Sequence, residues 1–360
     1  MVFGGSLHAP AAPAETQTPP SESPAATAPA ETAAPLVTPE PTPEPTPQTF
    51  TISFIGDITP DSVPFYRGSS VAYQNVVTAD NLGYVFEKTI QYFEDDDFTM
   101  ANFECALTNN TQAEDKNFTF RAPPEYAGIL TEGSVEFVTL GNNHVLDYGE
   151  QGYADTKAAL DGIGIGYAGR DEHTVYETAS GLKIGVYAVS FPDRTSQITE
   201  GIAALKEAGA EFIIAAIHWG DEGSYDVNSK QLEWGHAAVD AGADVVYGSH
   251  PHTLQPVEVY NGRYIFYSMG NWSFGGNTNP SDKDTAIARL EVTRDADGTC
   301  SVTDVRLIPC ASSGVANGNN YQPVPYEEGG AEYERAISKL EGTFTGANLT
   351  IPYDYGYNEY

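Results

Sequence analysis

Five apolar segments of this chain are each followed at once by polar side chains of the kinds that bind ligands, and this recurrence limits the fold more than any other feature. Helical patterns separate the segments, as in an α/β protein. Folds of this class place ligand sites just beyond the carboxyl ends of their strands. We therefore expect five parts of the chain to converge on one site. The segments are residues 50–55 before Asp57, 98–102 before Glu104, 135–140 before Asn142, Asn143 and His144, 211–217 before His218, and 243–248 before Ser249-His250-Pro251-His252.

The chain beyond His252 has the pattern of β-structure alone. Residues 257–260 and 264–267 flank Asn261-Gly262, which is a strong signal for a tight hairpin turn. We expect these strands and those predicted later to form a second sheet stacked on the first. The further predicted elements are strands at 183–189, 286–293 and 301–308, and helices at about 84–93, after Pro123-Pro124, at 151–160 and at 230–241.

The first 49 residues have the composition of a tether. Half of the 24 prolines lie between Pro10 and Pro47, among Ala, Thr, Ser and Glu and without a single Lys or Arg. Such a segment does not bury a core and favours extended backbone. We interpret the chain as a disordered tether at 1–49, one domain at 50–311, and a Tyr-rich extension at 312–360 that packs on the domain or is partly disordered.

This organisation and the charge of the chain limit its location and partners. A Pro/Thr/Glu-rich stalk ahead of a domain is typical of bacterial surface proteins, so we expect an extracellular, cell-surface-tethered protein whose export signal or membrane anchor lies upstream of this chain. The 17 Lys and Arg stand against 50 Asp and Glu, which gives a formal net charge of −33. A phosphate backbone repels such an excess of acid, so we expect no nucleic-acid partner.

His250-Pro251-His252 is the sharpest local motif. Imidazoles two residues apart in extended backbone point to the same side, and the proline between them stiffens the segment. Two such rings can serve neighbouring metal ions. Taken alone, such a motif occurs by chance and favours a structural or surface role. Its position directly after a buried strand, with other ligand types after the other strands, favours metal ligation.

Asp57, Glu104 and His218 supply the donors that a pair of divalent ions needs. The two carboxylates are hard oxygen ligands, and one carboxylate can bridge two ions about 3.5–4 Å apart. Their alternative roles are helix caps or turn residues. His218 follows an apolar run and is either a ligand at the carboxyl end of a strand or a histidine of the core. The nearby His-Pro-His motif favours the ligand.

The segment NNHVLD at 142–147 offers an amide oxygen for a metal and an imidazole, His144, for acid–base catalysis. Asp147 follows His144 by three residues and orients the ring if the segment is helical. The alternative is a helix N-cap cluster, which asparagine favours. Arg121 lies next to apolar residues and is a candidate for holding a substrate carboxylate or phosphate with two hydrogen bonds, with a surface ion pair as the alternative.

Six motifs in this order resemble the poly-γ-glutamate capsule-synthesis (CapA-type, PGA_cap) family of the calcineurin-like metallophosphoesterase superfamily. The resemblance covers residues 51–274 and implies an α/β fold of stacked β-sheets flanked by helices, an α/β/β/α sandwich. The motifs are GDITPD, NFECAL, FRAPPEYAGIL, TLGNNHVLDYG, AAIHWGDE and GADVVYGSHPHTLQPVEVYNGRYIFYSMGNWSF.

The same resemblance implies a role for each candidate residue. Asp57 and His252 match ligands of a first ion, and Glu104 stands where the superfamily has a bridging aspartate. His144 matches the histidine that protonates a leaving group from outside the metal shell. The ligands matched to the second ion are Asn143, His218 and His250.

Two positions depart from the pattern. The superfamily has a histidine two residues after the first aspartate, where this chain has Thr59. Glu104 is longer by one methylene than the usual aspartate. The first site is therefore expected to bind its ion weakly, to hold water or to be empty.

The resemblance implies a metal-dependent hydrolase or transferase with one or two Mn²⁺, Fe or Zn²⁺ ions. The expected substrate is a γ-glutamyl amide or a phosphoester in an anionic polymer or the cell wall. The alternative is a non-catalytic tethered accessory subunit that docks with a membrane-bound polymer synthase or export complex. A third class, binding of sugar or wall polymer, would use tyrosines near the C-terminus, which are Tyr321, Tyr326, Tyr353, Tyr355, Tyr357 and Tyr360.

Overall fold

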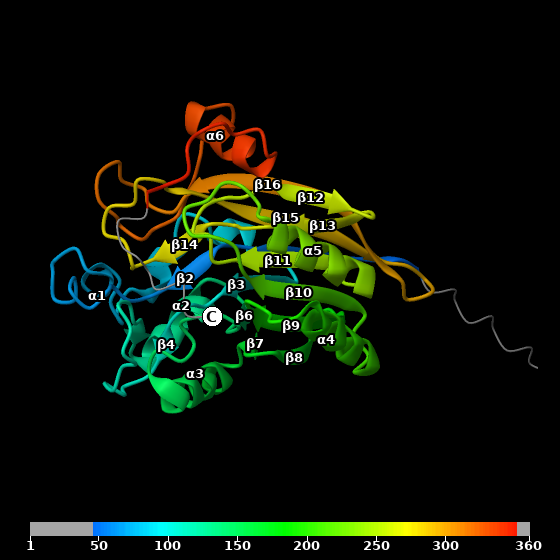
Figure 1. Cartoon of the computed structure of the whole chain (residues 1–360), viewed down its shortest axis with the longest axis horizontal. Helices are drawn as coiled ribbons and strands as arrows, with labels where there is room; N and C mark the ends of the chain where they lie inside the picture. The colour runs from blue at the N-terminus through cyan, green and yellow to red at the C-terminus, as the bar shows by residue number, and fades with distance from the viewer. Residues whose placement is uncertain (1–45, 351–360) are drawn as a thin grey trace, which may run out of the picture. The chain divides into compact units, whose positions relative to one another are not determined.

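The computed structural model describes residues 46–350, which contain a seven-stranded sheet (Figure 1). Its strands lie in the order β17 (Val324–Pro325), β16 (Cys300–Ala311), β15 (Asp284–Arg294), β1 (Gln48–Phe54), β3 (Phe98–Asn102), β6 (Phe137–Thr139) and β7 (Gly166–Ala168). The four strands from β1 to β7 are parallel. The three strands on the other side of β1 continue the sheet in antiparallel fashion.

A second sheet has six strands. They lie in the order β12 (Val257–Tyr260), β13 (Arg263–Phe266), β11 (Val245–Ser249), β10 (Phe212–His218), β9 (Lys183–Ser190) and β8 (Glu172–Glu177). Strands β9, β10, β11 and β13 are parallel. The predicted hairpin joins β12 to β13, and Asn261 and Gly262 have φ angles of 48° and 77°, as this type of tight turn requires.

The two sheets pack face to face, and helices cover their outer faces. Phe54 of β1 contacts Tyr247 of β11 and Phe266 of β13 across the interface, with ring centroids 5.5 and 5.8 Å apart. Helices α4 (Thr195–Glu207) and α5 (Ser229–Ala241) cover the second sheet, while α2 (Gly128–Glu132) and α3 (Gly149–Ile163) cover the first. The predicted α/β/β/α sandwich is therefore confirmed.

Local sequence signals explain where the long helices begin and end. The side chain of Asn228 accepts hydrogen bonds from the backbone N–H groups of Lys230 and Gln231 and so caps α5. Gly242 then ends this helix with a φ of 102°, a conformation that glycine adopts at little cost. Gly164 ends α3 in the same way.

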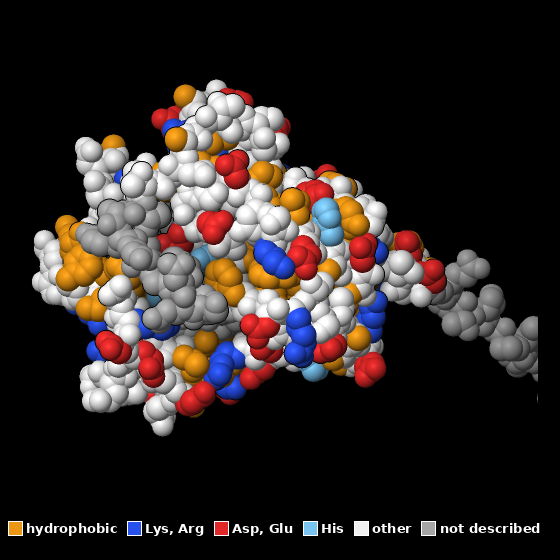
Figure 2. All heavy atoms as spheres, in the orientation of Figure 1, with side chains coloured by type: hydrophobic (Ala, Val, Ile, Leu, Met, Phe, Trp, Pro, Cys, Tyr) orange, Lys and Arg blue, Asp and Glu red, His pale blue; other side chains and the backbone are white. Residues whose placement is uncertain are grey.

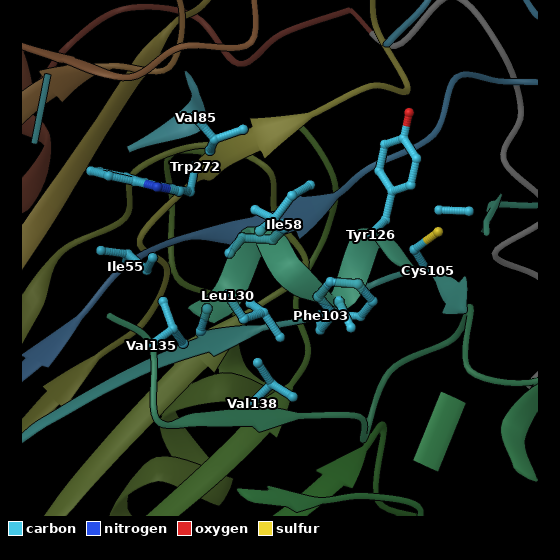
Figure 3. Close-up of a cluster of buried hydrophobic side chains, with 14 of the residues drawn as sticks. Ile55, Ile58, Val85, Phe103, Cys105, Tyr126, Leu130, Val135, Val138 and Trp272 are labelled. Atoms are coloured by element: carbon cyan, nitrogen blue, oxygen red, sulfur yellow. The ribbon is translucent and has the colours of Figure 1, made fainter. Parts of the chain in front are cut away.

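Two expectations about the fold are wrong. The late strands do not form a sheet of their own, because β12 and β13 extend the second sheet while β15–β17 extend the first. The expected helix at 84–93 is two short 3₁₀ helices, η1 (Leu82–Val85) and η2 (Ile90–Tyr92). Phe86 and Phe93 pack against Trp272, at ring-centroid distances of 6.0 and 5.8 Å, and this packing outweighs local helix preference. Figure 3 shows Trp272 beside Val85 in this core.

Several short elements complete the first half of the chain. Strand β2 (Asp57–Thr59) pairs with β14 (Asn271–Phe274), which places Asp57 opposite Asn271. Gly56 makes the bend before β2 possible, since a Cβ atom there would lie 2.1 Å from the carbonyl oxygen of Gly270. The remaining elements are α1 (Tyr73–Val76), β4 (Ala106–Leu107), β5 (Arg121–Ala122) and η3 (Pro124–Ala127).

Helix α6 (Ala331–Leu340) attaches the C-terminal part of the chain to β15 and β16. The ammonium group of Lys339 lies 2.6 Å from Asp282 Oδ2 and 2.7 Å from Asp284 Oδ2, and Arg335 also binds Asp284. Lys339 and Asp284 are almost completely buried. The chain then turns back, and the N–H group of Leu349 donates to the carbonyl oxygen of Gly223 at 2.9 Å.

The structure tests the predicted tether and the predicted Tyr-rich extension only where their residues are described. Tyr321 is buried, and the hydroxyl of Tyr326 donates to Asp284 Oδ1 at 2.7 Å. Residues 1–45 of the predicted tether, together with Tyr353, Tyr355, Tyr357 and Tyr360, lie outside the described residues. Within 46–350 no helix has the length and apolar character that crossing a membrane requires.

Candidate metal centre

The candidate ligands come together where parallel strands of both sheets end. Asp57 and Glu104 follow β1 and β3 of the first sheet, while His218 ends β10 and His250 follows β11 of the second. All four side chains are buried. The two facing sheets therefore bring into one cluster residues that lie up to about 190 positions apart in the sequence.

Three overlapping groups in this cluster could each hold a metal ion. In each group the donor atoms lie within 4.8 Å of one another. The closest approaches are 3.2 Å between His252 Nδ1 and Asp57 Oδ2, 3.6 Å between His218 Nε2 and Glu104 Oε1, and 3.5 Å between His252 Nε2 and Glu222 Oε1. The groups are Glu104, His218 and His250; Asp57, Glu104 and His252; and Glu222, His250 and His252.

Asparagines connect these donors. Asn143 Oδ1 lies 3.0 Å from His218 Nε2, so the amide oxygen predicted as a ligand faces the cluster. The amide of Asn102 donates to Asp57 Oδ1 at 2.9 Å and to Glu104 Oε2 at 3.3 Å. Asn142 in turn donates to Asn102 Oδ1 at 3.0 Å. Each carboxylate is therefore held through one oxygen, and the other oxygen faces the donor cluster.

The second oxygens of these carboxylates are the atoms that a cation would satisfy. Asp57 Oδ2 and Glu104 Oε1 are buried and accept no hydrogen bond. A buried carboxylate oxygen without a partner is costly unless it binds a donor or a metal. Imidazole nitrogens, carboxylate oxygens and an amide oxygen together suit Mn²⁺, Fe or Zn²⁺. The residues present therefore fit a divalent metal centre.

The electrostatics of the cluster agree with this fit. Burial lowers the pKa of His250 to about 3, and burial together with the neighbouring histidines lowers the pKa of His218. Both rings are thus neutral at pH 7, which is the form that binds metals. Burial raises the pKa of Glu104 to about 8, although His252 opposes the shift. A bound cation would favour the carboxylate instead.

His144 and Asp147 form a pair at the edge of the cluster. His144 Nδ1 lies 2.7 Å from Asp147 Oδ2, while Nε2 points toward the cluster and lies 3.9 Å from Glu104 Oε1. Residues 144–147 form a turn and not a helix, yet the spacing of three brings the side chains together. Burial opposes protonation of His144, but Asp147 and Glu104 raise its pKa above the usual value.

A cavity of about 350 Å³ gives access to the centre. His144, Glu222 and His252 line it together with Phe118, Phe120 and Phe274. Leu349 and Thr350 of the C-terminal segment form part of its wall. A polar centre at one side of a partly aromatic cavity is a common arrangement for small-molecule or polymer-end binding.

Two further positions discussed from the sequence are Arg121 and Thr59. The guanidinium of Arg121 lies over the ring of Tyr148, 5.5 Å from its centroid, and Nη1 donates to the carbonyl oxygen of Asn109 at 3.4 Å. Arg121 is not among the residues that line the 350 Å³ cavity. The hydroxyl of Thr59 donates to the main-chain oxygen of Glu104 at 3.3 Å.

Sequence reasoning missed three residues of the site, namely Asn102, Glu222 and Asn271. Asn271 Oδ1 lies 2.9 Å from His252 Nδ1. Asn102 ends a predicted strand just before Glu104, so the rule that ligands follow strand ends applied to it as well. Glu222 follows His218 by four residues within HWGDE, and only the fold shows that its loop turns back to His252.

Sequence comparisons place this chain among capsule-related proteins of bacteria. The family model described as bacterial capsule synthesis protein PGA_cap matches residues 51–275. The chain is 29% identical to the PGA biosynthesis protein CapA of Bacillus subtilis, over 71% of each chain. It is 28% identical to the capsule biosynthesis protein CapA of Bacillus anthracis, over 67% of this chain and 64% of the relative.

More distant similarities are to proteins described with other functions. A probable polyglutamine synthesis accessory protein of Mycobacterium tuberculosis is 27% identical over 49% of this chain and 55% of its own. The solved NAD nucleotidase of Haemophilus influenzae aligns with a TM-score of 0.45 and 14% identity, over 82% of this chain and 56% of the nucleotidase. A purple acid phosphatase from yellow lupin aligns with a TM-score of 0.35 and 10% identity, over 86% of this chain and 58% of the phosphatase.

Proposed function

Because the chain belongs to the bacterial capsule synthesis protein PGA_cap family, we propose that it is a metal-dependent hydrolase or transferase of capsule biosynthesis at the cell surface. Its substrate is a γ-glutamyl amide or a phosphoester in an anionic polymer such as poly-γ-glutamate, or in the cell wall. One observation carries this proposal: the three overlapping donor groups lie beside the His144–Asp147 pair, and His144, Glu222 and His252 line one cavity.

The donor groups divide into two ion sites. Asp57, Glu104 and His252 would hold the first ion. Glu104, His218 and His250 would hold the second, with Asn143 beside His218 as a further ligand. Bound divalent ions supply a Lewis acid for an acyl or phosphoryl oxygen and lower the pKa of a coordinated water.

His144 is suited to protonate the leaving group. Asp147 engages Nδ1, so that Nε2 carries its proton toward the donor cluster and the cavity. Asp147 also favours the imidazolium form, which keeps the proton on the ring near neutral pH. Asp147 is held in place because its oxygens also accept the N–H of Phe120 at 2.8 Å and the ammonium of Lys116 at 3.2 Å.

The charge of the protein affects how it meets a polyanion. The net charge of −33 repels a polyglutamate chain at low ionic strength. On the face in Figure 2, Lys and Arg side chains are interspersed among Asp and Glu side chains. Binding of the polymer should therefore depend on cations in the cleft and strengthen with moderate salt.

The second candidate function is that of a non-catalytic accessory subunit of a membrane-bound polymer synthase or export complex. The observation that favours it is Thr59, whose hydroxyl is engaged with the main chain of Glu104 where the superfamily pattern has a histidine donor. A first site with one donor fewer would bind its ion weakly. In that case the domain would serve its partner as a docking surface.

Two measurements separate these functions. Elemental analysis of the purified protein beside the His250→Ala/His252→Ala variant should find at least one transition-metal equivalent that the variant lacks. The metal-loaded protein should then shorten poly-γ-glutamate or release phosphate from model esters, and His144→Ala should not. Absence of metal in both proteins, even after incubation with Mn²⁺, Fe²⁺ and Zn²⁺, would reject the enzyme and leave the accessory subunit.

A further inference from the structure

We propose that Glu222 is a metal ligand that takes the place of the histidine missing at position 59. This inference rests on the proposed metal centre and adds to it a donor that the motif pattern does not contain. The carboxylate lies on the cavity side of the cluster, where it approaches His252 of the first ion site and His250 of the second.

Thr59 cannot serve as the missing donor. Its side chain is completely buried, and its hydroxyl donates to the main-chain oxygen of Glu104. The carbonyl oxygen of Thr59 is also engaged, because it accepts the N–H of Gly275 at 2.9 Å. A neutral alcohol already committed to a carbonyl is a poor replacement for imidazole. The first site needs a donor from another part of the chain.

The carboxylate of Glu222 is placed to supply it. Its Oε1 lies 3.5 Å from His252 Nε2, and its donor atom lies within 4.8 Å of those of His250 and His252. The side chain is only 8% exposed. A carboxylate this little exposed is stabilised by positive charge, and a divalent cation offers more of that charge than an imidazole, together with a coordination bond.

The loop that carries Glu222 is fixed on the side of the metal centre. The N–H of Gly223 donates to the carbonyl oxygen of Pro251, between the two histidines, at 2.8 Å. The hydroxyl of Thr253 donates to the carbonyl oxygen of Ser224 at 2.8 Å, and the amide of Gln255 donates to the same oxygen at 3.0 Å. Glu222 and the His-Pro-His segment therefore keep a constant separation, as a metal site requires.

The C-terminal segment fixes the same loop from the other side. Leu349 N–H donates to the carbonyl oxygen of Gly223 at 2.9 Å, and Asn348 Oδ1 accepts the N–H of Tyr225 at 2.9 Å. The ring of Tyr225 packs against Phe344 with centroids 4.8 Å apart, and its hydroxyl donates to Asp282 at 2.7 Å. The donor is thus preorganised and loses little conformational entropy when an ion binds.

The neighbouring Asp221 provides a matched control. It also carries a carboxylate, but it is exposed and accepts a hydrogen bond from the amide of Asn228 at 2.9 Å. Asp221→Asn therefore removes the same charge one residue away without touching the cluster. Glu222→Gln removes the anionic donor and keeps an oxygen that can accept a hydrogen bond from His252. Glu222→His offers the imidazole that the superfamily pattern has at its first site.

Mn²⁺ binding to the full chain, measured by isothermal titration and by electron paramagnetic resonance of free Mn²⁺, tests the proposal. We expect Glu222→Gln to weaken one class of site at least tenfold, while Asp221→Asn stays within twofold of wild type. Thermal midpoints in EDTA that agree across the variants exclude misfolding. A Kd for Glu222→Gln within twofold of wild type would overturn the inference and leave the metal centre intact. A wild-type protein that binds no Mn²⁺ would overturn both.

A Co²⁺ spectrum distinguishes a ligand from a residue that only orients His252. If Glu222 coordinates the ion, Glu222→His replaces an oxygen by a nitrogen donor, and the visible absorption bands of the Co²⁺ protein should shift. A residue that acts only through His252 leaves the bands in place. Unchanged bands in Glu222→His, with Co²⁺ bound at wild-type stoichiometry, would reject direct coordination.

Discussion

His144 Nδ1 lies 2.7 Å from Asp147 Oδ2, and this contact leaves only Nε2 of the ring to meet the donor cluster. The pair resembles other sites in which a carboxylate fixes the tautomer and the orientation of a catalytic imidazole. Because Asp147 also accepts a backbone N–H group, its position does not depend on His144 alone. The proposed acid function of His144 can therefore be tested by substituting Asp147.

Asp147→Asn should lower activity about tenfold or more and move the alkaline limb of the pH–rate profile to lower pH. The wild-type carboxylate raises the pKa of His144 against the effect of burial, so its removal makes the ring lose its proton at lower pH. A pH–rate profile of polymer or ester cleavage measures this shift. Glu150→Gln, an exposed carboxylate nearby, should leave the profile unchanged. An unshifted limb in Asp147→Asn would contradict the role of His144 as the acid.

Metal should stabilise the folded protein. A ligand that binds only the native state adds about 2.7 kcal/mol at a concentration one hundred times its Kd. We expect Mn²⁺ to raise the midpoint of thermal unfolding relative to EDTA. The His250→Ala/His252→Ala variant should lose this increase, whereas His236→Ala, which removes a surface histidine paired with Glu258, should keep it. An equal increase in the double variant would show that the metal binds elsewhere.

Lys339→Met should destabilise the protein by about 3 kcal/mol, since breaking a buried ion pair leaves an uncompensated charge. Lys339 is 1% exposed and faces Asp282 and Asp284, of which only Asp284 would keep a cationic partner, Arg335. Urea unfolding at pH 7 measures the loss. Lys230→Met removes an exposed ion pair with Glu233 and should change stability by less than about 1 kcal/mol. Equal effects of the two changes would contradict the structural role of the buried cluster.

Glu136 should make stability decrease as pH rises from about 4.5 to above 7. Burial raises the pKa of Glu136 to about 7, so the folded state keeps a proton that the unfolded state releases in this range. The stabilising effect is complete below the unfolded pKa and is lost as pH rises through the folded one. Glu136→Gln, which can still accept the N–H of Thr99, should be more stable than wild type at pH 8 and similar to it at pH 4. Parallel stability–pH curves for the two proteins would refute the shift.

Much of the fold follows from local sequence, but sheet membership does not. The hairpin at Asn261-Gly262 and the ends of α3 and α5 at Gly164 and Gly242 depend on residues within a few positions. The place of β15 beside β1 depends on a contact with a strand far away in the chain, which no local pattern encodes. The expected helix at 84–93 failed for the same reason, because Phe86 and Phe93 pack on the distant Trp272.

The same distinction between local and distant determinants applies to the candidate site. Residues at strand ends, such as Glu104 and His218, could be selected from sequence because strand ends meet at one edge. Glu222 lies in a loop, and its position depends on the hydrogen bond between Gly223 and Pro251. Arg121 has the chemistry of an anion clamp, but the local chain directs its guanidinium over Tyr148. The chemical type of these two residues alone did not reveal where their side chains point.

The contact between Leu349 and Gly223 brings the C-terminal segment to the wall of a cavity that His144 and His252 also line. His144, Glu222 and His252 belong to residues 51–275, which the family model matches, whereas Leu349 and Thr350 lie beyond that segment. A change at Leu349 or Thr350 can therefore alter the wall of the cavity without altering the candidate donors. The fit of a molecule in this cavity thus depends in part on residues outside the segment that the family model matches.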